Sequence, residues 1–71
     1  MPYTIDQQIA CVQREIRRRE REYPPLVAQH QLSPSKAHHE LACLKAVLDT
    51  LRTTQQHIWA QAVLFPEEDQ A

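Results

Sequence analysis

The residues with the clearest potential for chemistry are two cysteines and one of the four histidines. His39 and Cys43 are four positions apart, which places them on one face of a helix, and Cys11 falls at nearly the same level if the chain folds as a helical hairpin. Thiolate and imidazole groups in such a cluster are ligands for zinc, but a structural site needs a fourth ligand, and none is matched to these three. We therefore favour the alternative that both cysteines are small residues at the edge of a helix contact. We predict no metal site and no cofactor.

Catalytic groupings are missing from the sequence. It has no glycine-rich phosphate loop, no nucleophile elbow and no carboxylate pair on an apolar seam. A protein made of two helices also offers little concave volume for a substrate. We predict that the protein is not an enzyme.

The most charged stretch, residues 14–22, contains five arginines and three glutamates. One interpretation is a surface for phosphate or for an acidic partner. The other is a solvated helix face crossed by ion pairs one turn apart, such as Glu15 with Arg19 and Arg18 with Glu22. We favour the second interpretation.

Arg19 differs from the other arginines because it falls on the apolar seam of the predicted helix. A partly buried guanidinium needs a carboxylate partner, and Glu40 lies close to its level in the predicted hairpin. We predict a structural ion pair between Arg19 and Glu40. The substitution Glu40→Ala removes this pair and is expected to lower the stability of the fold substantially.

These residues are positioned by helices, because a chain of 71 residues without glycine disfavours tight β-hairpins. The first helix is predicted over residues 5–23. It starts with a capping box formed by Thr4 and Gln7, and Pro24 disfavours helical backbone at the residue before it. Its apolar seam consists of Ile5, Ile9, Val12 and Ile16.

A second, longer helix is predicted over residues 34–65, with Ser33 as the N-cap and Pro34 at the first helical position. Residues 24–33 between the helices are predicted to form an ordered connector, and residues 66–71 an acidic tail. The whole chain is then one all-α domain, an antiparallel helical hairpin with coiled-coil-like seams.

The two predicted helices differ in length, so residues 53–65 extend beyond the first helix and carry apolar side chains that need burial. The simplest cover is a second copy, which predicts a homodimer with four helices. An alternative is that the second helix breaks at Thr53 and Thr54 and folds back on its own hairpin. The predicted interface residues are Leu51, Ile58, Trp59, Ala62, Val63 and Phe65.

Composition also limits the partners and the location. The net charge of −1 argues against a general nucleic-acid binder. Residues 26–41 nevertheless resemble a helix-turn-helix, although the helix that follows is longer than a recognition helix and sparse in basic residues. No apolar run is long enough for a membrane span, and the first residues do not read as a signal peptide. We expect a cytoplasmic protein with reduced thiols.

One pattern resembles a family. An arginine-rich helix ends in Arg21-Glu22-Tyr23-Pro24, a short connector follows, and a second helix opens with an Ala-x-x-Glu-Leu sequence at residues 37–41. Over residues 14–52 this is similar to a group of small, largely uncharacterised phage and prophage proteins. Members often have glycine in the connector, where this chain has His30 and Gln31, and the segment from residue 53 onward lies outside the resemblance.

The resemblance implies a phage or prophage origin, and hence the host cytoplasm as location, but it implies no mechanism. Together with the residues, it predicts a small protein-interaction module. The module would act as a homodimer that modulates an unidentified host or phage protein. A nucleic-acid-binding accessory protein and a structural assembly component are the alternatives.

Overall fold

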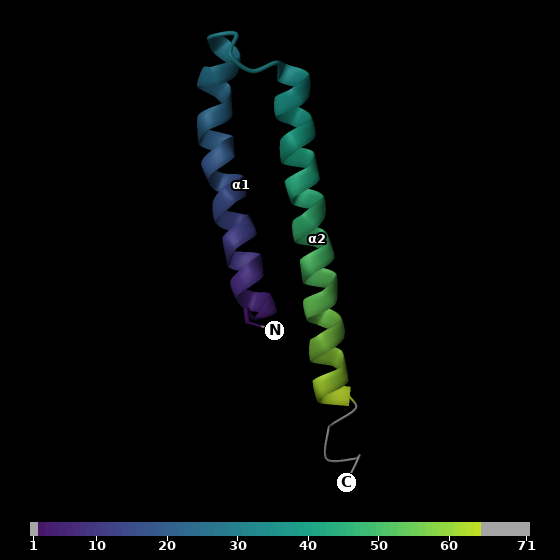
Figure 1. Ribbon diagram of the computed structural model, residues 1–71. Coiled ribbons are helices and arrows are strands. Elements are labelled where there is room, and N and C mark those ends of the chain that lie inside the picture. The colour runs from purple at the N-terminus through teal and green to yellow at the C-terminus, as the bar shows by residue number, and fades with distance from the viewer. Residues whose placement is uncertain (1, 65–71) are drawn as a thin grey trace.

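The computed structural model describes residues 2–64, which form two antiparallel helices joined at one end (Figure 1). Helix α1 spans Ile5–Ala28 and helix α2 spans Pro34–Leu64. This part of the chain contains no strand, and the two helices pack against each other. The predicted all-α helical hairpin is therefore confirmed.

Helix α1 begins with the capping box that the sequence indicates. The Thr4 hydroxyl accepts a hydrogen bond of 3.1 Å from the Gln7 backbone N–H, and the Gln7 side chain accepts one of 2.9 Å from the Thr4 backbone N–H. Asp6 adds a negative charge in the first turn, where the helix dipole favours it. These contacts satisfy backbone donors that have no partner inside the helix.

The predicted end of the first helix at about Tyr23 is wrong, because α1 continues through Pro24 and Pro25 to Ala28. A proline keeps a helical φ but donates no hydrogen bond to the carbonyl one turn earlier, so this passage has a cost. The extra turn brings Leu26 and Val27 to partly buried positions, and their burial offsets part of that cost. Tertiary packing here outweighs the local preference of the backbone.

The connector is consequently shorter than the predicted segment 24–33. It begins with a Schellman motif, in which His30 N–H donates to the Val27 carbonyl over 3.1 Å and Gln31 N–H donates to the Leu26 carbonyl over 2.9 Å. His30 takes a φ of 60°, the left-handed conformation that glycine usually supplies at this position. The cap thus forms without glycine.

Residues 26–41 do not contain a separate short helix before their turn. They comprise the last turn of α1, the connector and the start of α2, and the two helices run antiparallel. A helix-turn-helix motif instead crosses its two helices at about 90–120°. The structural premise of the helix-turn-helix alternative is therefore wrong.

Helix α2 begins at Pro34, where the Ser33 hydroxyl accepts a hydrogen bond of 3.1 Å from the Lys36 N–H. The helix is continuous to Leu64, so the alternative break at Thr53 and Thr54 is wrong. The Thr54 hydroxyl donates to the carbonyl of Thr50 over 3.0 Å, which keeps this side chain satisfied within the helix.

The core is thin. Within the described residues, the buried apolar side chains are those of Ile9, Ile16 and Ala37. The leucines that face them from α2 are half-buried: Leu41, Leu44 and Leu48. A single layer of two helices can cover only one side of each seam, which leaves little hydrophobic stabilisation for the hairpin alone.

Helix α2 extends past the start of α1 (Figure 1). The Gln55 side chain donates a hydrogen bond of 2.6 Å to the Asp6 carboxylate, which places Gln55 level with the first turn of α1. We call the part of α2 after Gln55 the overhang. Neither helix of residues 2–64 is both long and apolar enough to cross a membrane.

Candidate interaction surface

The overhang carries large apolar side chains that the described part of the chain does not cover. Ile58 is 51% exposed and Trp59 is 64% exposed. Ala62 is also exposed, whereas Leu51 lies within the hairpin and is half-buried. Phe65 and the side chain of Val63 lie outside the described residues. A contiguous exposed patch of this kind is typical of a surface that binds another molecule.

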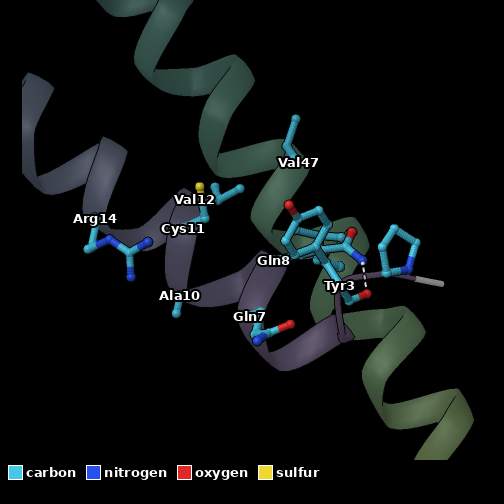
Figure 2. A pocket seen from close by; sticks show the side chains of 10 residues that line it. Tyr3, Gln7, Gln8, Ala10, Cys11, Val12, Arg14 and Val47 are labelled. Carbon is cyan, nitrogen blue, oxygen red and sulfur yellow. Dashed lines mark hydrogen bonds between the residues drawn. The ribbon is translucent and has the colours of Figure 1, made fainter.

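A groove lies beside the overhang, at the open end of the hairpin. We call it the apolar groove; its volume is about 860 Å³, and it is lined by both helices and by the residues before α1. Figure 2 shows Tyr3, Val12 and Val47 around it, with Arg14 at its other end. Tyr3 is 66% exposed and Val47 is 42% exposed.

Tyr3 is absent from the predicted interface, and Val47 is too. The sequence did hold a signal for each of them. Val47 flanks the apolar seam of α2, and Tyr3 immediately precedes the N-cap Thr4, where an apolar residue often packs against the first turns of the helix. Only the antiparallel pairing of the helices brings Tyr3 and Val47 to one groove.

A second groove, of about 450 Å³, continues along α1 from the apolar groove. We call it the arginine groove. Its lining residues are Cys11, Arg14, Glu15, Arg17, Arg18 and Arg21. Cys11 and Arg14 line both grooves, so the two form one continuous surface that is apolar at the open end of the hairpin and basic further along α1.

Glu15 holds two of the arginines by ion pairs. Its carboxylate accepts hydrogen bonds from Arg18 over 2.5 Å and from Arg19 over 2.7 Å. These bonds, with that from Arg18 the stronger, lower the pKa of Glu15 from 4.5 to about 2. Glu22 lies 3.5 Å from Arg18. The predicted pairs Glu15–Arg19 and Arg18–Glu22 are thus both present.

The favoured interpretation of the charged stretch does not account for every arginine. Within residues 2–64, Arg14, Arg17 and Arg21 form no ion pair, and all three are exposed. They lie at helical spacing on one side of α1 and line the arginine groove. This row of cations is available to an anionic group.

Arg19 reaches across the hairpin to Glu40, with Nη1 3.8 Å from Oε2. The predicted pair is present but long, and Arg19 has closer partners on its own helix. Its Nε donates to Glu15 over 2.7 Å and its Nη1 to the Tyr23 hydroxyl over 3.0 Å. These contacts, led by the hydrogen bond to Glu15, raise the pKa of the Arg19 guanidinium.

The cysteines and His39 are not brought together as ligands. Among residues 2–64 no group of three or more His, Cys, Asp or Glu side chains could hold a metal ion. Cys11 and Cys43 are free and exposed. The surface therefore offers apolar contact and positive charge to a binding partner.

No family model, curated protein or solved structure matches the chain.

Proposed function

We propose that the protein is a small interaction module that works as a homodimer of helical hairpins. Each copy would contribute its overhang and the open side of its helix seam to a four-helix assembly. The observation that carries this proposal is the exposure of Ile58 and Trp59 on a continuous helix that extends beyond its partner helix.

The energetics support association. Burial of Ile58 and Trp59 on dimerisation would contribute roughly 1.5–3 kcal/mol for each side chain. The hairpin alone buries only Ile9, Ile16 and Ala37 among the described residues, so it gains much from a second layer. The half-buried leucines of α2 would complete their burial in the same contact.

The dimer would in turn bind a host or phage protein as a modulator in the host cytoplasm. The support for this step is the similarity of residues 14–52 to small phage and prophage proteins. Pull-down with the purified full chain, with and without nuclease, tests it. A protein band retained after nuclease treatment supports the modulator, whereas retention that nuclease abolishes would point to nucleic acid instead.

Sedimentation velocity over a range of concentrations tests self-association. We expect a dimer at micromolar concentration, and we expect Trp59→Ala to shift the equilibrium toward monomer. His57→Ala is a matched control, because His57 is exposed on the same helix and, two positions from Trp59, lies on the opposite side of the helix from it. A wild-type protein that stays monomeric at every concentration would overturn the proposal.

A further inference from the structure

The two grooves on α1 specify how the second copy binds. We propose that the C-terminal segment of the second copy lies along them, parallel to α1 and antiparallel to α2 of the first copy. Its apolar overhang would fill the apolar groove, and its acidic residues Glu67, Glu68 and Asp69 would lie on the arginine groove. This inference rests on the proposed homodimer and adds its orientation and its source of specificity.

The grooves of one copy and the C-terminal segment of the other both present apolar residues first and charged residues later. From the open end of the hairpin, the continuous surface presents Tyr3 and Val47 first and Arg17 and Arg21 further along α1. From the overhang toward the C-terminus, the chain presents Ile58 and Trp59 first and three consecutive acidic residues later. A second copy whose C-terminal segment runs parallel to α1 therefore matches apolar with apolar and acid with base.

The spacing also fits. Arg21 lies about 15 Å along α1 from Cys11, the residue that the arrangement places opposite Ala62, at ~1.5 Å per helical residue. Ala62 and Asp69 are separated by about 10 Å if the chain between them is helical, and by up to ~24 Å if it is extended. The distance required lies between these limits.

The acidic residues cannot reach the arginine groove of their own chain. Asp6 and Gln55 lie at the same level of the hairpin. At the helical rise, Arg17 lies about 16 Å from this level toward the closed end, and Leu64 lies about 13 Å from it toward the end of the overhang. The segment from Leu64 to Asp69 spans at most ~18 Å, well short of the roughly 30 Å needed. Because α2 is continuous, only a second copy can supply the acidic segment.

A two-fold axis makes the arrangement reciprocal. If the overhang of one copy fills the apolar groove of the other, the same rotation places the second overhang in the first groove. With Ile58 and Trp59 level with Leu51 of the other copy, the axis passes close to Gln55. The contact closes on itself, so the product is a dimer and not a filament.

Charge reversal tests the orientation. We expect the pair Arg17→Glu with Arg21→Glu to weaken the dimer about tenfold, and Glu67→Arg with Glu68→Arg to do the same. All four substitutions in one chain should restore the affinity, because the reversed charges again face each other across the two-fold axis. Lys36→Glu is the control, since Lys36 is exposed near the closed end of the hairpin and lies outside both grooves.

The outcomes separate the two proposals, with circular dichroism to verify that each variant is helical. A dimer that responds to Trp59→Ala but is indifferent to both charge reversals would overturn this orientation and leave the homodimer standing. Failure of the fourfold variant to recover would overturn the orientation as well. A wild-type monomer would overturn both proposals.

Thiol cross-linking provides a second readout. Cys11 lies where the two grooves meet, opposite the region of Ala62 in the proposed dimer. In a Cys43→Ser background, oxidation with diamide is expected to join Cys11 to the new thiol of Ala62→Cys in an intermolecular disulfide, which mass spectrometry identifies. Ala28→Cys, at the closed end of the hairpin, should not link to Cys11. Equal linkage to Cys11 in both variants would contradict the orientation.

Discussion

Arg19 donates a hydrogen bond of 2.7 Å from its Nε to Glu15, which lies one turn earlier on the same helix. Glu15 also accepts a bond of 2.5 Å from Arg18, so one carboxylate holds two adjacent guanidinium groups. Glu15 thereby fixes Arg19 at the helix interface and pairs with Arg18, whereas Arg14, Arg17 and Arg21 of the arginine groove form no ion pair within the described residues. The local pair on α1 organises this end of the hairpin more tightly than the long contact of Arg19 with Glu40.

The first prediction concerns the acid stability that follows from Glu15. The two arginine hydrogen bonds lower its pKa from 4.5 to about 2 in the folded protein. A lowered folded-state pKa means that the carboxylate stabilises the fold above pH 4.5, and that this contribution is lost as the pH falls through about 2. Glu15→Gln should therefore melt below the wild type at neutral pH, and the two melting temperatures should converge near pH 2.

Thermal unfolding followed by circular dichroism across this pH range measures the difference. Glu22→Gln is the control, because Glu22 has only the longer contact of 3.5 Å with Arg18 and should give a smaller difference at neutral pH. If the difference in melting temperature between Glu15→Gln and the wild type stayed constant down to pH 2, the lowered pKa of Glu15 would be contradicted.

The second prediction is that Glu40 contributes little to the stability of the hairpin. Its contact with Arg19 is 3.8 Å and reaches solvent, and Arg19 keeps two other partners when Glu40 is lost. We expect Glu40→Gln to cost no more than about 0.5 kcal/mol in the free energy of unfolding. Chemical denaturation measures this, with Asp49→Asn as the control on the same helix. A loss above ~2 kcal/mol would restore the strong pair that the sequence alone predicts.

The third prediction concerns the end of α1. His30 adopts a φ of 60°, which a side chain with a Cβ disfavours and glycine does not. His30→Gly should therefore stabilise the protein by about 0.5–1 kcal/mol, even though glycine gives the unfolded chain more freedom. Gln31→Gly, at the next position of the connector, should not stabilise it. Equal destabilisation by both substitutions would show that the left-handed cap carries no strain.

Much of the fold was predictable from local signals. The capping box at Thr4, the N-cap at Ser33 and the spacing of the apolar residues describe contacts within a few residues of one another, and local chemistry determines them. The end of α1 was not predictable in this way. Pro24 and Pro25 favour a stop, but the burial of Leu26 and Val27 depends on a helix that is distant in the sequence.

The surface was predictable only in part. The overhang follows from the unequal lengths of the two apolar seams, so Ile58 and Trp59 could be identified from the sequence. The grooves could not, because they are formed by residues that become neighbours only when the helices pair. The charged stretch was ambiguous for a similar reason. Glu15 and Glu22 form ion pairs with arginines and Glu20 pairs with Lys45 of α2, which leaves Arg17 and Arg21 without an ion pair in the described residues.

The last prediction separates the core of the hairpin from its proposed interface. Ile16 is 7% exposed and Ile58 is 51% exposed, so truncation of the two side chains should act on different equilibria. Ile16→Ala should lower the free energy of unfolding by about 2–4 kcal/mol, because it leaves a cavity between the helices. Ile58→Ala should leave the hairpin intact and weaken association.

Unfolding measured at two protein concentrations distinguishes these effects, because a dimer that dissociates on unfolding becomes more stable as its concentration rises. The concentration dependence should persist in Ile16→Ala at a lower overall stability. In Ile58→Ala it should shrink, while the stability at the lower concentration stays close to that of the wild type. If Ile58→Ala instead retained the full concentration dependence, Ile58 would lie outside the interface, and the overhang would need another partner.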